Sequence, residues 1–102
     1  MDIHTIRELV FAKQIRFTEH ALDESGAARL SQSEVEESLL SGDIIEVESD
    51  ARGTKYRVQG WTFYTRRVVE SIVAVRHDDN ADHDFANVIT VFERKSKPRG
   101  GR

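Results

Sequence analysis

The sequence predicts an α+β domain in which N-terminal helices are packed on one face of a three- to four-stranded antiparallel sheet. Three observations predict this class. Apolar residues recur at helical spacing through the first 41 residues, the period changes to two after Gly42, and the later strands are joined by short loops. Short connections between successive strands are typical of an antiparallel meander. We expect one domain over residues 1–94 and a flexible basic tail over residues 95–102.

Two helices are expected in the first 30 residues. A first helix is predicted over residues 3–13, because the apolar residues Ile3, Ile6 and Val10 recur at helical spacing. A short extended link then precedes Thr18. This residue is the expected N-cap of a second helix that continues to about Arg29.

The strongest local signal marks a third helix over residues 32–41. Ser31 and Glu34 have the spacing of a capping box, in which each side chain accepts a hydrogen bond from the other residue's backbone N–H. Gly42 stands where a left-handed residue commonly ends a helix.

After Gly42 the pattern becomes typical of strands. Apolar and polar residues alternate, and β-branched residues become frequent. A turn is expected over residues 49–54 and a polar loop over residues 77–84. Gly60 interrupts one strand, which residues 61–64 are expected to extend beyond a bulge. The expected strands lie at residues 45–48, 55–59, 68–76 and 85–93.

Composition excludes several classes of protein. The 102 residues contain no cysteine, which excludes disulfide scaffolds, thiol nucleophiles and cysteine-ligated zinc. No apolar run approaches the roughly 20 residues that a membrane span requires, and the N-terminus does not resemble a signal peptide. We therefore expect a cytoplasmic protein that does not bind a membrane and needs no cofactor.

Charge is divided unevenly along the chain. Residues 1–50 contain 4 Lys and Arg against 12 Asp and Glu, whereas residues 51–102 contain 11 against 6. A chain with separate acidic and basic regions can bind nucleic acid with one face, although its net charge is −3. A soluble surface of mixed sign is the simpler interpretation.

Five sequence blocks resemble a known family. FTEHALDE, LSQSEVEESLLSGDIIEV, GTKYRV, SIVAV and NVITVFE occur in this order between residues 15 and 94. Together they resemble the domain-of-unknown-function family DUF 4258. That family looks related to the RelE-like and BrnT-like toxins of toxin–antitoxin pairs, small α+β proteins whose sheet carries RNA-cleaving groups. The resemblance implies a RelE-like fold and a cognate antitoxin as partner.

The chain departs from the family pattern near the second helix. The family has Arg-Gly before Ile-Ser, and this chain has Ala28 and Arg29 there. Some members carry a basic residue at the position of Glu24. Both departures remove positive charge from the neighbourhood of His20.

His20 is the candidate catalytic residue. The Thr18 cap places it in the first turn of a helix, where backbone N–H groups attract anions. Metal-independent RNA cleavage needs a base for the 2′-hydroxyl, an acid for the leaving oxygen and cations for the developing charge. We expect His20 to act as base or acid, Arg57 to clamp the phosphate and Tyr56 to assist. A histidine bonded to a backbone carbonyl for structural reasons is the alternative.

Further basic residues are expected to hold an RNA backbone. If Tyr56 faces the helices, Lys55 and Arg57 face the open side of the sheet, and Arg76 joins them from a neighbouring strand. Other candidates lie in or near loops, namely Arg52, Arg66 and Arg67. Outward Lys and Arg that only solubilise the sheet are the commoner case.

Three hypotheses about function follow. The first is a RelE-like endoribonuclease of the mRNA interferase type, which cleaves RNA without metal. The second is a non-catalytic module on the same scaffold, which binds RNA or a protein partner through the basic face of the sheet. The third is a subunit of a protein complex, whose exposed sheet face or edge receives a partner strand or helix. Three aromatic residues follow the basic strand, namely Trp61, Phe63 and Tyr64. Such residues suit base stacking, but they are more often core or interface residues.

The loop HDDNADHD over residues 77–84 partly imitates the oxygen spacing of a calcium loop. His83 occupies the position that needs glycine, and Ile89 stands where the twelfth-position glutamate belongs. We therefore expect a solvated acidic hairpin tip and no metal site.

Overall fold

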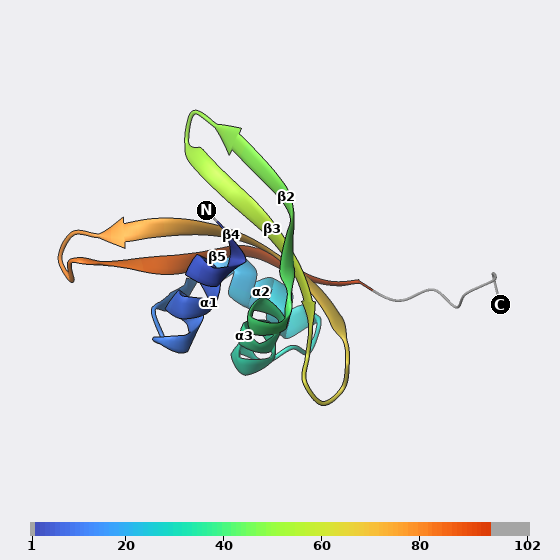
Figure 1. The fold of residues 1–102 in the computed structure, drawn as a ribbon. Helices are drawn as coiled ribbons and strands as arrows, with labels where there is room; N and C mark the ends of the chain where they lie inside the picture. The colour runs from blue at the N-terminus through green and yellow to red at the C-terminus, as the bar shows by residue number, and fades with distance from the viewer. Residues whose placement is uncertain (1, 95–102) are drawn as a thin grey trace.

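The computed structural model describes residues 2–94, which form three helices and a five-stranded sheet (Figure 1). The expected α+β class is confirmed, and the predicted basic tail at residues 95–102 lies outside the described residues. The elements in chain order are α1 (Ile3–Phe11), β1 (Ile15–Phe17), α2 (Glu19–Ala27), α3 (Gln32–Ser41), β2 (Asp43–Asp50), β3 (Gly53–Trp61), β4 (Val68–Asp78) and β5 (His83–Arg94).

The strand order in the sheet is β1-β5-β4-β3-β2. Strands β2 to β5 form the expected antiparallel meander, and β1 pairs in parallel with β5. The expectation of three to four strands missed β1, because Ile15–Phe17 is too short to show a period. This link becomes a strand because it lies along β5, where Ile15 pairs with Ala86 and Phe17 with Val88.

Two connections differ from the prediction. Strand β3 runs through Gly60 in regular pairing and ends at Trp61, so the predicted extension is right for Trp61 and wrong for residues 62–64. A closed turn follows instead, in which Thr62 donates its N–H to the Arg67 carbonyl at 3.0 Å. The polar loop over residues 77–84 shrinks to a short tip, because His77 pairs with Asp84 and Asp78 with His83 in the β4–β5 ladder.

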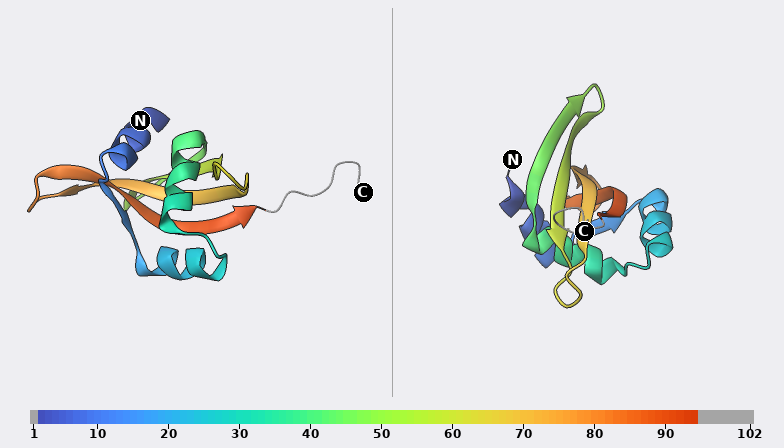
Figure 2. Two further views of the ribbon diagram at one scale, coloured as in Figure 1. Left: turned by 90° about the horizontal axis from the view of Figure 1, so that it is seen from below. Right: turned by 90° about the vertical axis from the view of Figure 1, so that its right-hand side faces the viewer.

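The hydrophobic core lies between the helices and one face of the sheet. Figure 2 shows α3 across the middle of the sheet, with α1 and α2 on either side of it. Alternation in β3 buries Tyr56, Val58 and Gly60 toward the helices. The other face, which bears Lys55, Arg57 and Gln59, is covered by none of the described helices, and we call it the helix-free face. The core contains buried aliphatic side chains from both the helices and the strands, among them Ile6, Val10, Ala21, Val35, Leu39, Val58, Val69, Val73, Val88 and Val91.

Helix α3 approaches the sheet at two glycines. A Cβ on Gly60 would lie 1.8 Å from the Ser38 carbonyl oxygen, and a Cβ on Gly42 would lie 2.3 Å from that of Gln59. Gly42 has a φ of −95°, so the predicted left-handed conformation at this position is wrong. The structure needs glycine there because the chain passes against β3, not because the helix ends in a left-handed turn.

Helix α2 ends earlier than the predicted Arg29. It stops at Ala27, and Arg29 has a left-handed φ of 57°. Arg29 donates its N–H to the Gly26 carbonyl, and Leu30 donates to that of Ser25. These two bonds form a Schellman motif, whose left-handed position usually holds glycine. Arg29 occupies the glycine position of the Arg-Gly-Ile-Ser pattern.

Replacing Arg29 with glycine is expected to raise the free energy of unfolding by about 1 kcal/mol, because glycine adopts a positive φ without steric cost. Urea denaturation followed by circular dichroism measures the change. The matched control is Arg29→Ala, which retains a Cβ and should bring no comparable gain. Equal gains in both variants would show that the arginine side chain, and not the backbone conformation, destabilises the helix end.

Candidate nucleic-acid interface

His20 lies in the first turn of α2, as the sequence predicted. The Thr18 hydroxyl accepts a hydrogen bond from the Ala21 N–H at 3.1 Å, which confirms the N-cap. The imidazole is 69% exposed, and its Nε2 lies 3.2 Å from Oε2 of Glu24. The other Glu24 oxygen accepts the Val91 N–H at 2.9 Å. His20 therefore faces a carboxylate, whereas RNA cleavage needs a cation beside it.

Tyr56 and Arg57 project from opposite faces of β3, because neighbouring residues on a strand alternate. Tyr56 is only 9% exposed and belongs to the core. Arg57 lies on the helix-free face, so one substrate cannot contact both side chains there. Among the described residues, no hydrogen bond or ion pair joins either residue to His20. The structure therefore does not gather the three catalytic candidates around one point.

The Arg57 guanidinium is held by two carboxylates. Its Nε donates to Glu46 at 2.9 Å and its Nη1 to Glu70 at 3.2 Å. These hydrogen bonds raise the pKa of Arg57 above its usual value, and the bond with Glu70 has a larger effect than that with Glu46. A phosphate would have to compete with both carboxylates, so Arg57 is a poor phosphate clamp in this state.

Glu70 is the residue that the sequence interpretation missed. It is 1% exposed on the helix-free face and also accepts a hydrogen bond from Gln59 at 3.0 Å. Arg94 pairs with it at 3.0 Å. The available signal was the single charge in the β-branched run VVESIVAV. A charged residue in such a run is buried only when it has partners.

Three of the basic candidates share one end of the helix-free face. Arg57 is level with Ile72, so alternation puts Arg76 on the same face as Lys55. Arg76 also approaches Gly53 at the start of β3. Arg52 lies in the adjoining β2–β3 turn. Within residues 2–94, no carboxylate lies within ion-pair distance of these three cations, and we call Arg52, Lys55 and Arg76 the basic patch.

Arg66 and Arg67 lie at the opposite end of β3, in the turn before β4. Arg67 donates to the Glu93 carboxylate and to the backbone carbonyls of Ala28 and Arg29. The hydrogen bond with Glu93 is the main cause of the raised pKa of Arg67. Arg67 thus ties the end of α2 to β5. Of this pair only Arg66 is an exposed cation.

The comparisons with known proteins give one result. A family model described as a domain of unknown function (DUF4258) matches residues 17–93. The chain belongs to the DUF4258 family. No curated protein and no solved structure matches it. This DUF4258 domain has no helix among its described residues that is long and apolar enough to cross a membrane.

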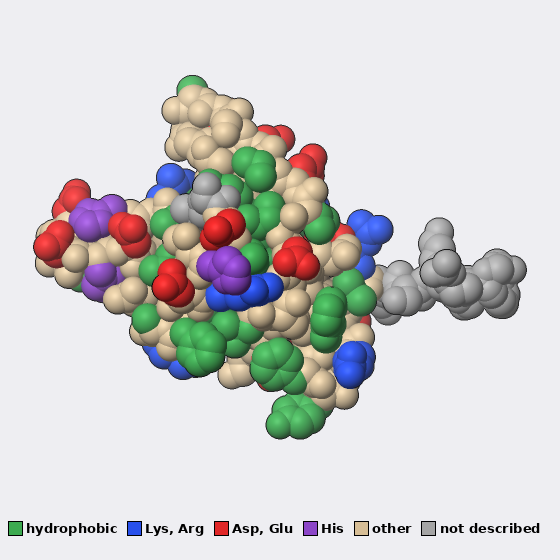
Figure 3. All heavy atoms as spheres, viewed as in Figure 1, with side chains coloured by type: hydrophobic (Ala, Val, Ile, Leu, Met, Phe, Trp, Pro, Cys, Tyr) green, Lys and Arg blue, Asp and Glu red, His purple; other side chains and the backbone are tan. Residues whose placement is uncertain are grey.

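The tip of the β4–β5 hairpin of this DUF4258 domain is acidic, as Figure 3 shows. His77 lies 2.8 Å from Asp84, 3.4 Å from Asp82 and 3.8 Å from Asp79. The described residues contain no cluster of three or more His, Asp or Glu that could hold a metal ion.

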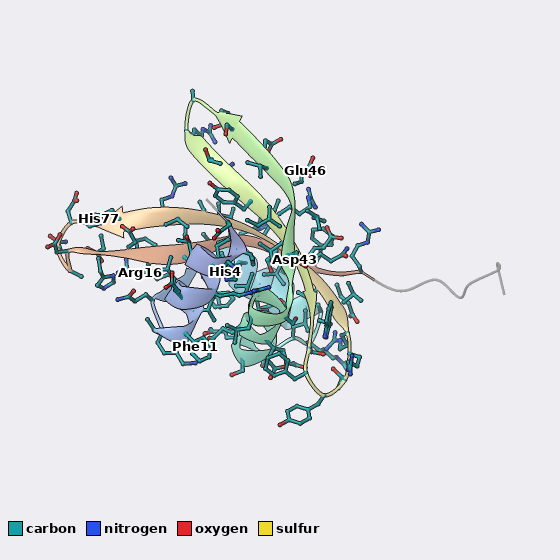
Figure 4. All side chains as sticks on the ribbon, in the orientation of Figure 1. His4, Phe11, Arg16, Asp43, Glu46 and His77 are labelled. Carbon is teal, nitrogen blue, oxygen red and sulfur yellow. The ribbon has the colours of Figure 1, made fainter. Side chains whose placement is uncertain are left out.

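Arg16 on β1 is a further cation that the sequence interpretation did not select. Its guanidinium carbon lies 3.9 Å from the centre of the Phe85 ring, and it pairs with Asp78. Figure 4 shows Arg16 beside the β4–β5 hairpin, with His77 near the tip. Phe85 is level with Arg76 of the basic patch, so a half-buried aromatic ring lies between two arginines.

The Asp78 carboxylate is expected to titrate at an unusually low pH. Hydrogen bonds from Arg16 and from the Ala81 N–H lower its pKa from 3.8 to about 2. Because the folded value lies below the unfolded one, this contribution to stability is complete above pH ~4 and is lost as the pH falls through about 2. An NMR titration that follows the Asp78 carboxyl carbon measures this pKa. The Arg16→Gln substitution should return the pKa of Asp78 toward 3.8. An unchanged pKa in that variant would contradict the assignment to Arg16.

Proposed function

We propose that this DUF4258 domain is a non-catalytic RNA-binding module, which holds a single strand on the helix-free face of its sheet. One observation carries the proposal. The basic patch retains three cations without an ion pair, whereas Arg57 and Arg67 are neutralised by carboxylates. Uncompensated Lys and Arg on an open surface are what a phosphate backbone recognises.

Phe85 supports RNA as the ligand of this face. Single-stranded RNA is bound by aromatic rings that stack on bases and by cations that hold the flanking phosphates. Phe85 lies level with Arg76, and Arg16 stacks on its ring. Because Arg16 covers one face of the ring, the surface offered to a base beside the basic patch is the Phe85 ring together with the Arg16 guanidinium.

The endoribonuclease hypothesis, with an antitoxin as partner, has less support from the geometry. It needs His20 and Arg57 to act on one phosphate, with Tyr56 as an auxiliary group. His20 and Arg57 each face carboxylates, and Tyr56 is buried in the core. Binding without cleavage is therefore the function that the arrangement favours.

Fluorescence anisotropy with a labelled single-stranded RNA of ~20 nucleotides tests the proposal, in buffer that contains EDTA. We expect the RNA to be bound and not cleaved. A plot of log affinity against log salt concentration should have a slope of about −2, because each of the three cations of the basic patch contributes about −0.7. Lys55→Ala and Arg76→Ala should each weaken binding and reduce the slope by about 0.7.

Arg66→Ala is the matched control, because it removes an exposed arginine at the opposite end of β3 and should leave the affinity unchanged. A Lys55→Ala Arg76→Ala double variant that binds as tightly as the parent would refute the proposal. RNA cleavage in EDTA that is lost in His20→Ala would establish the endoribonuclease instead.

A further inference from the structure

Strand β2 is an exposed edge of the sheet. It is last in the strand order, and with β3 it forms an arm that projects away from the helices (Figure 1). Residues 45–50 are exposed on both faces of this arm. An edge strand presents a row of backbone N–H and C=O groups that another strand can pair with.

Two large apolar side chains on β2 are left uncovered. Ile45 is 50% exposed and Val47 is 57% exposed. Natural edge strands are usually short, or carry lysine or proline that discourages pairing. This edge is eight residues long and contains neither lysine nor proline, and beyond a register shift at Ile45 its pairing is regular from Glu46 to Asp50. Its exposed aliphatic groups suit the side chains of an added strand.

Four of the eight residues of this edge are carboxylates. Glu46 and Glu48 lie opposite Arg57 and Lys55 in the β2–β3 ladder, and Asp50 lies opposite Gly53. Figure 3 shows acidic side chains beside hydrophobic ones on the β2–β3 arm, and Figure 4 labels Glu46 on β2. The edge is therefore acidic toward the helix-free face and aliphatic at Ile45 and Val47.

This charge pattern decides between two occupants. If a second copy paired with β2, it would bring the same row of carboxylates close to Glu46, Glu48 and Asp50. Like charges on neighbouring strands are destabilising. An added strand with Lys or Arg at alternate positions would instead place opposite charges next to these carboxylates.

We infer that β2 is the docking site for an extended segment of a different protein, in which apolar residues alternate with Lys or Arg. The segment pairs with the outer edge of β2, packs its apolar side chains near Val47 and places its cations beside Glu46 and Glu48. The site borders the basic patch, because Glu48 lies opposite Lys55. It uses the outer edge and the carboxylates of β2, so its binding does not rest on the proposed RNA binding.

A short synthetic peptide of alternating Lys and Val, capped at both ends, is the probe. We expect it to slow amide hydrogen exchange at residues 45–50 of the full chain, and a peptide of alternating Glu and Val to leave that exchange unchanged. A Lys–Val peptide with methylated backbone nitrogens should also fail, because it cannot donate hydrogen bonds to the edge. Equal binding of the methylated peptide would overturn strand addition.

Glu48→Lys in β2 should weaken binding of the Lys–Val peptide by about tenfold, because attraction becomes repulsion. Asp23→Lys makes the same change of charge on the exposed surface of α2 and should leave binding unchanged. Equal weakening in both variants would show that only the net charge matters, and would overturn the site. Slow exchange at β2 without peptide, together with a dimer in sedimentation, would identify a second copy as the occupant and also overturn it.

Discussion

Replacing Gly60 with alanine is expected to lower the free energy of unfolding by about 3 kcal/mol. The new Cβ would lie 1.8 Å from the Ser38 carbonyl oxygen and 2.9 Å from the Gly42 Cα. Both contacts are with backbone atoms, which cannot turn away as a side chain can. Helix α3 would have to move off β3, and its core residues Val35 and Leu39 would lose packing. Chemical denaturation of the two proteins measures the difference.

The matched control for Gly60→Ala is Gly26→Ala in α2. No atom lies within 4 Å of a Cβ built at Gly26, and the residue is in the interior of a helix. Alanine there should raise the free energy of unfolding by roughly 0.5–1 kcal/mol. The same substitution thus has opposite signs at the two sites. A loss at Gly60 no larger than ~0.5 kcal/mol would show that α3 does not pack as closely as the structure has it.

Replacing Glu70 with alanine is expected to cost about 3 kcal/mol, because it removes a buried acceptor that three side chains share and leaves a void in its place. The carboxylate is 1% exposed and receives Arg57, Gln59 and Arg94. The positive charges of the two arginines would then face each other across the vacated position. The midpoint and slope of a urea unfolding curve give the change in stability.

The control for Glu70→Ala removes the other carboxylate that binds Arg57. The Glu46 side chain is 62% exposed, so Glu46→Ala should cost less than ~1 kcal/mol. Glu70→Gln should fall between the two, since it retains the shape of the side chain and loses its charge. If Glu70→Ala and Glu46→Ala had equal effects, burial would not be what makes the Glu70 pairs important.

The sequence predicted best those features that depend on near neighbours. The capping box of Ser31 and Glu34 forms with both hydrogen bonds present, and Thr18 caps α2 as expected. A cap is decided within three or four residues, so the sequence contains the whole signal. The predicted extension failed beyond Trp61, because the Thr62–Arg67 turn depends on hydrogen bonds of the Thr62 side chain and backbone with Arg67.

The candidate site was predicted only in part. Alternation along β3 correctly separated Tyr56 from Lys55 and Arg57, because successive side chains on a strand must point to opposite faces. That rule cannot show which of the cations meets a carboxylate. Lys55 and Arg57 are equivalent in the sequence pattern, yet only Arg57 reaches Glu70 on the neighbouring strand.

By itself, the sequence determined the α+β class, the helix starts and the side of the sheet that each β3 residue faces. The tertiary structure alone decided that Ile15–Phe17 becomes a strand, that Glu70 is buried, and that Arg57 is neutralised while Arg76 is not. The physical reason is the range of the interactions. Caps and alternation act over a few residues, whereas ion pairs and strand pairing join residues that only the strand order brings together.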